Sequence, residues 1–183
     1  MTLGEGKRRV YMLLDEYSSG GTVTRDEDLE KKMADFFDTA QKQAAEIKKI
    51  RRIVTMELKE GQTLYPLPKD LMKLIRVWRG DMPTRAYRFK GGMMEIPEGE
   101  SEKVEIEYFA IPATIGPDTP DDYEFELSED AAKALPYFVA SQQLISDLVM
   151  DYGALYSIYQ TMLSTLSLAE IGGHSLVNSF YRR

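Results

Sequence analysis

The chain has 183 residues, with no cysteine, one histidine and a formal net charge of −7. The lack of cysteine excludes disulfides and thiolate metal sites within this sequence, and no apolar run approaches the roughly 20 residues of a membrane-spanning helix. The acidic balance is opposite to the basic footprint of most nucleic-acid-binding domains.

The first part of the chain predicts two helices. An apolar face that recurs every three or four residues up to Tyr17 indicates a helix over about residues 5–17, which Ser18–Gly21 ends. A longer stripe from Leu29 to Ile47 keeps the same period and predicts a second helix over about residues 25–50.

The middle of the chain, about residues 53–109, changes to a period of two and predicts strands. Ile53–Leu58 and Leu71–Trp78 read as strands, whereas the prolines around Leu67 confine that piece to an edge or a loop. Gly91-Gly92 predicts a tight hairpin between Arg85–Phe89 and Met93–Ile96.

The last predicted strand alternates apolar and acidic residues between Val104 and Tyr108. We therefore expect Glu105 and Glu107 to point to solvent, opposite the apolar face. A loop rich in proline follows over Ile111–Asp122.

The final part predicts two more helices, over about residues 129–151 and 154–171. Pro136 predicts a kink or a late start in the first of them, and Gly172-Gly173 predicts the end of the second.

These elements predict an α+β fold: a helical bundle formed by N- and C-terminal helix pairs with a central antiparallel β insertion. We expect residues 1–173 to form a single domain and residues 174–183 to form a C-terminal tail.

No constellation in the sequence predicts a reaction. His174 is the only imidazole, and it follows a double glycine near the C-terminus, where a base is poorly preorganised. The Asp118–Asp122 run could in principle hold a hard cation but lacks the spacing of a known loop. We expect no catalytic, cofactor or metal site and no enzymatic activity.

Interaction surfaces are better supported. The tail combines apolar, aromatic and arginine residues, which are enriched at interface anchors, although a frayed end remains an alternative. Charged residues are unevenly distributed, with a basic cluster at Lys48–Arg52 and acidic runs at Asp26–Glu30 and Asp118–Asp130. This asymmetry suits contacts between copies of the chain, or simply a solvated surface. Trp78, flanked by arginines, could anchor the core or a subunit contact, or stack on a base.

Several segments together resemble the head-to-tail adaptor (connector) proteins of tailed bacteriophages. The similar segments include the opening helix that ends in Leu14–Ser18, the long second helix, and Tyr65–Leu71 leading into Ile75–Val77. They also include Ile106–Tyr108 with the loop that follows it, and Ala134–Tyr137 before a helix of small and apolar residues.

The resemblance implies a virion protein at the capsid–tail junction, assembled in the host cytoplasm as a homo-oligomeric ring of about twelve copies beneath the portal. It implies that the C-terminal segment docks on the portal, that a downstream tail or neck protein is a second partner, and that DNA is only passing cargo. The predicted portal-docking residues are Leu176, Val177, Phe180, Tyr181, Arg182 and Arg183.

The β insertion is expected to face a tail component or a neighbouring subunit. The residues predicted for that contact are Arg79, Arg85, Lys90, Met93 and Met94. The alternative function is a DNA-binding packaging or regulatory protein. It is supported by the basic cluster at Lys48–Arg52 and by Trp78, which lies between Arg76 and Arg79.

Overall fold

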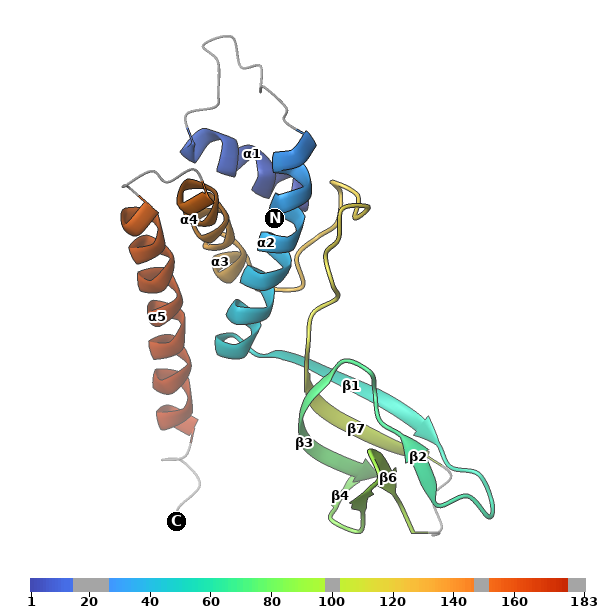
Figure 1. Cartoon of the computed structure of the whole chain (residues 1–183). Coiled ribbons are helices and arrows are strands. Elements are labelled where there is room, and N and C mark those ends of the chain that lie inside the picture. Colours follow the sequence, from blue (N-terminus) through green and yellow to red (C-terminus); the bar gives the residue numbers. More distant parts are fainter. Residues whose placement is uncertain (15–26, 98–102, 147–151, 178–183) are drawn as a thin grey trace. The chain divides into compact units, whose positions relative to one another are not determined.

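The computed structural model describes residues 1–14, 27–97, 103–146 and 152–177, with side chains of the last helix described as far as Leu166. The chain divides into two compact units (Figure 1). The helical unit comprises residues 1–48 and 113–183, and the β unit comprises residues 49–112.

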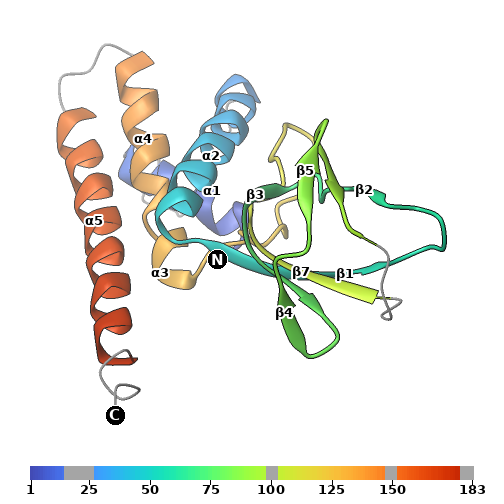
Figure 2. The same cartoon turned by 90° about the horizontal axis from the view of Figure 1, so that it is seen from below.

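Five helices lie among the described residues of the helical unit: α1 (Leu3–Leu13), α2 (Glu27–Ile47), α3 (Glu129–Ala132), α4 (Leu135–Ser146) and α5 (Tyr152–Val177). In both views α4 lies between α2 and α5 (Figures 1 and 2), and α1 packs on α4. The core contains Phe37, Leu135 and Tyr159, each fully buried. Gly6 lets α1 approach this core closely, since an added Cβ there would lie 3.0 Å from the Phe37 ring.

The β unit contains two antiparallel sheets. One has the order β1-β7-β3-β4, built from β1 (Ile50–Glu57), β7 (Lys103–Ala110), β3 (Leu71–Arg79) and β4 (Met82–Thr84). The other has the order β2-β6-β5, built from β2 (Leu64–Pro66), β6 (Met93–Glu95) and β5 (Arg88–Lys90). Met94, Val104 and Ile106 are fully buried in the core of this unit.

The expected arrangement of two helix pairs around one β insertion is wrong. The structure is α+β and its β region is central, but two helices precede that region and three follow it, so the helices flank it unevenly. Pro136 explains part of the difference, because α3 ends at Ala132 and α4 starts anew at Leu135, which places the proline in its first turn. The β region consists of two antiparallel sheets.

Two local expectations have clear outcomes. The hairpin at Gly91-Gly92 is confirmed, since β5 and β6 pair around these glycines and both have positive φ, 59° and 77°. The expectation that Glu107 faces solvent is wrong: its side chain is only 2% exposed and forms an ion pair with Arg51. Glu105, two residues away, is exposed as expected.

α5 differs from its expected end. It continues through Gly172-Gly173 to Val177, because glycine weakens a helix by only about 1 kcal/mol per residue and does not by itself forbid it. None of the described helices is long and apolar enough to cross a membrane.

Candidate interaction surfaces

The predicted portal-docking tail lies mostly outside the described residues. Leu176 and Val177 form the last residues of α5, so this helix leads directly into the tail. Phe180, Tyr181, Arg182 and Arg183 fall beyond the described part of the chain. The docking role of all six residues therefore stays a prediction.

The second predicted contact centres on residues 79–90 of the β unit, which we call the basic segment. It contains Arg79, Arg85, Arg88 and Lys90 against a single acid, Asp81. The segment includes β4 and β5, which form one edge of each sheet. Edge strands present unpaired backbone groups to solvent, so this is a natural docking side of the β unit.

The structure places the five predicted residues of this contact at different depths. Arg85 and Lys90 are exposed, and Arg79 is half-buried, its guanidinium donating to the Pro97 carbonyl at 2.7 Å. Met93 is half-buried, whereas Met94 is fully buried in the core and reaches no surface.

Two apolar side chains that sequence reasoning did not single out accompany these cations. Met82 is 72% exposed and Phe89 is 56% exposed, although both are large hydrophobic residues. The Phe89 ring packs edge-on against Tyr87, with centroids 5.8 Å apart. Exposed aromatic and methionine side chains among arginines are typical of interface anchors.

A pocket of about 720 Å³ opens beside the basic segment. Arg85 and Arg88 line it together with Tyr87, and Glu95 contributes one carboxylate. Arg88 and Glu95 are direct cross-strand partners in the β5–β6 pair. Arg85 and Lys90 lie outside this pair and are exposed positive groups of the same surface.

The helical unit carries an acidic counterpart at residues 116–124, which we call the acidic loop. Gly116-Pro117 and Pro120-Asp121 begin two successive β-turns, closed by backbone bonds of 3.0 Å (Thr119 to Gly116) and 3.1 Å (Tyr123 to Pro120). The loop holds four acids and no Lys or Arg. One acid, Asp121, pairs with Lys7 at 2.7 Å.

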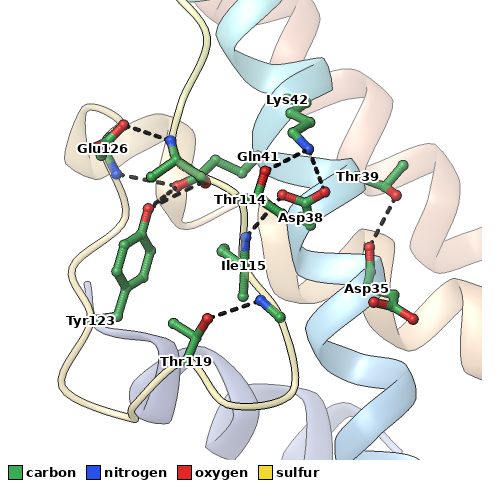
Figure 3. Close-up of polar contacts among 12 residues, drawn as sticks. Asp35, Asp38, Thr39, Gln41, Lys42, Thr114, Ile115, Thr119, Tyr123 and Glu126 are labelled. Carbon is green, nitrogen blue, oxygen red and sulfur yellow. Dashed lines mark hydrogen bonds and ion pairs between the residues drawn. The ribbon is translucent and has the colours of Figure 1, made fainter. Parts of the chain in front are cut away.

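A buried glutamine fixes the base of this loop to α2 (Figure 3). Gln41 is fully buried, and its amide nitrogen donates to the Ala113 carbonyl at 3.0 Å while its amide oxygen accepts from the Glu126 backbone at 3.2 Å. These bonds join the two ends of the segment that contains the acidic loop. The loop is thereby anchored on both sides to one rigid helix.

A second anchor lies one turn earlier on α2 (Figure 3). The Asp38 carboxylate accepts from the Ile115 backbone at 3.0 Å and pairs with Lys42 at 2.6 Å. Lys42 also donates to Thr114 at 3.4 Å. The N-terminus of α1 adds two backbone bonds of 2.8 Å, from Leu3 and Gly4 to the loop.

The outer face of α5 forms a third surface. From Tyr152 to Ala169 the helix contains no charged residue, and its exposed residues include Tyr156 and Ile158, 40% and 42% exposed. The other exposed positions are mostly uncharged polar residues, among them Ser157, Gln160 and Thr161, and burying such groups costs less than burying charges. This face is thus suited to contact another chain.

The charge of the two units differs in sign. Residues 49–112 hold 12 Lys and Arg against 10 Asp and Glu, whereas the rest of the chain holds 11 against 20. The acidity of the protein therefore resides in the helical unit, and the β unit is slightly basic.

Sequence reasoning missed the anchoring roles of Gln41 and Asp38 and placed Glu107 wrongly in solvent. The signal for Gln41 was its position, since it lies four residues after Phe37 and so falls within the buried stripe of α2. No comparable signal predicts that Glu107 is buried, because the strict alternation of apolar and acidic residues places it on the face of the strand expected to be exposed to solvent.

Among the residues that the structure describes, the groups with a raised tyrosine pKa lie in different units. Burial raises the pKa of Tyr159, whose hydroxyl donates to Gln43 at 3.2 Å. In the other unit, burial and then the hydrogen bond to Asp70 raise the pKa of Tyr108. Both side chains serve packing, and among the described residues no group of three or more potential metal ligands converges.

Comparison with known proteins gives the family. The sequence model of the family described as SU10 adaptor protein matches residues 1–171. No curated protein matches the chain. The chain therefore belongs to the SU10 adaptor protein family, a family of structural phage head-tail adaptors. The resemblance inferred from its residues is confirmed, and residues 172–183 lie outside the matched region.

Proposed function

We propose that this adaptor forms a homo-oligomeric ring, of about twelve copies, beneath the portal of a tailed phage. The ring links the capsid to the tail and lines the passage for DNA. The family match over residues 1–171 is the observation that carries this proposal.

The outer face of α5 supports assembly into a ring. A ring requires two different complementary surfaces on each copy, so that a head-to-tail contact closes on itself. The uncharged α5 face, with Tyr156 and Ile158 exposed among small polar residues, supplies one surface for such a contact. Burying each such side chain would contribute about 1–2 kcal/mol to association.

The charge of the helical unit supports its place around the DNA. With 11 Lys and Arg against 20 Asp and Glu, it offers phosphates little electrostatic attraction. A conduit with this charge would let DNA pass without holding it.

The C-terminal segment, residues 174–183, is proposed to dock on the portal. It begins within α5, so a rigid helix delivers it, and it ends in two arginines after two aromatic residues. Arginine and aromatic side chains are common anchors in protein interfaces. A downstream tail or neck protein is the proposed second partner.

Deletion of residues 174–183 tests the docking role. Light scattering would compare full-length and truncated protein, each alone and mixed with the portal of the same phage. We expect both forms to retain the fold of the helical unit and only the full-length chain to bind the portal. Equal binding of the truncated chain would disprove the docking role, and no association of the full-length chain under either condition would disprove the adaptor ring.

A further inference from the structure

We propose that the basic segment of one copy binds the acidic loop of a neighbouring copy. This inference rests on the proposed ring and names a contact within it. It assigns the β unit to the assembly of copies, rather than to a tail protein or to DNA.

The acidic loop presents unpaired negative charge. Asp118, Asp122 and Glu124 are exposed, and none of them has an ion-pair partner among the described residues. The two β-turns place Asp118 and Asp122 at their corners, where side chains project outward. No cation within the loop offsets these charges.

The basic segment presents the complementary surface. Arg85 and Lys90 are exposed and have no acidic partner within the described residues. Phe89, next to Lys90 in β5, and Met82 in β4 add exposed apolar area to the basic segment, and the pocket lined by Arg85 offers about 720 Å³ in which a projecting loop can insert. Apolar anchors surrounded by charge are the usual composition of a specific docking surface.

Both surfaces are held in shape before they meet. Gln41 and Asp38 fix the ends of the acidic loop to α2 (Figure 3), and the edge-on contact with Tyr87 orients the Phe89 ring. A preorganised loop loses little conformational entropy on docking, which favours binding.

A second copy is the partner that the chain itself indicates. The basic segment and the acidic loop carry opposite charge and belong to different units of the same polypeptide. Such a pair forms a heterologous contact, which generates a ring when its rotation closes. A separate acidic protein or DNA would use only the basic segment and leave the acidic loop without a role.

Zero-length cross-linking tests the contact directly. Full-length protein with natural isotopes is mixed with ¹⁵N-labelled protein under assembly conditions and treated with a carbodiimide, which joins a lysine amine to a carboxylate in contact with it. We expect mixed-isotope peptides that join Lys90 to Asp118 or Asp122, and no such peptides from Lys69, an exposed lysine outside the basic segment. Arg85→Lys adds a second reporter at the same surface.

Charge reversal provides the functional test. Arg85→Glu with Lys90→Glu in one chain, or Asp118→Lys with Asp122→Lys in another, should each weaken self-association at least about tenfold. An equimolar mixture of these two variants should assemble again, because every contact in an alternating ring then pairs opposite charges.

Assembly of either variant as readily as the unmodified protein would overturn this inference while leaving the ring intact. Lack of association of the unmodified protein would overturn both. If the Arg85 and Lys90 variant instead loses salt-sensitive retention of duplex DNA and assembles normally, the basic segment is a nucleic-acid surface and the inference is wrong.

Discussion

Gln41→Leu tests whether one buried amide holds the acidic loop to α2. Leucine nearly preserves the volume of glutamine, so the change removes hydrogen bonds without leaving a large cavity. The Ala113 carbonyl and the Glu126 backbone N–H lose their partners, at 3.0 and 3.2 Å. Because Ala113 is exposed, its carbonyl can turn to water, and we expect a total loss of about 2–3 kcal/mol.

The loss is measurable as a shift in thermal unfolding. At about 2–4 °C per kcal/mol for a chain of this size, the midpoint of the helical signal in circular dichroism should fall by roughly 4–12 °C. Trp78 is the single tryptophan and lies in the β unit. Its fluorescence therefore reports separately on the β unit, which we expect to be much less affected.

Gln160→Leu is the matched control, because Gln160 is an exposed glutamine on α5. It should change stability by no more than about 0.5 kcal/mol. In Gln41→Leu, amide exchange at Ile115 and Glu126 should accelerate as the loop loosens. Unchanged exchange at both amides, with a midpoint equal to that of the control, would refute the anchoring role of Gln41.

Three further predictions concern the two units. Arg51→Ala should lower the free energy of unfolding of the β unit by about 1–3 kcal/mol, because the Glu107 carboxylate, only 2% exposed, loses its ion-pair partner. Urea unfolding followed by tryptophan fluorescence measures this loss. Glu107→Leu should cost less, since an apolar side chain needs no partner there, and a larger loss for Glu107→Leu than for Arg51→Ala would contradict this. Burial raises the pKa of Tyr159, so its contribution to stability is complete below pH 10, the unperturbed pKa of tyrosine, and should diminish as the pH rises above 10. Tyr159→Phe should flatten that decline when unfolding is measured as a function of pH. An equally steep decline in the variant would exclude Tyr159 as its cause. Residues 49–112 expressed alone should fold, because Ile50 and Ala110 pair across β1 and β7 and bring the ends together; an amide spectrum without dispersion would show that this unit depends on the helices.

Local patterns explain how much of the fold the sequence could predict. The α2 stripe and the Gly91-Gly92 hairpin depend on contacts between near neighbours, and both lie where periodicity and turn chemistry place them. Glu107 depends instead on Arg51, more than fifty positions earlier, which comes near only when β1 pairs with β7. No local pattern carries that information.

The same distinction applies to the candidate surfaces. Arg85 and Lys90 are exposed, as their surrounding composition indicates, but Met94 is buried although the adjacent Met93 is not. Strand alternation decides which of two adjacent methionines faces the core, and the phase of a three-residue strand is too short to read from sequence. The anchoring of the acidic loop by Gln41 likewise spans more than seventy positions.

Electron cryomicroscopy of the neck of the intact virion is the most direct test of the adaptor function. We expect a closed ring of this chain beneath the portal, with residues 174–183 of each copy in contact with portal subunits. A portal vertex without this chain, or single copies bound elsewhere on the particle, would contradict the proposed function.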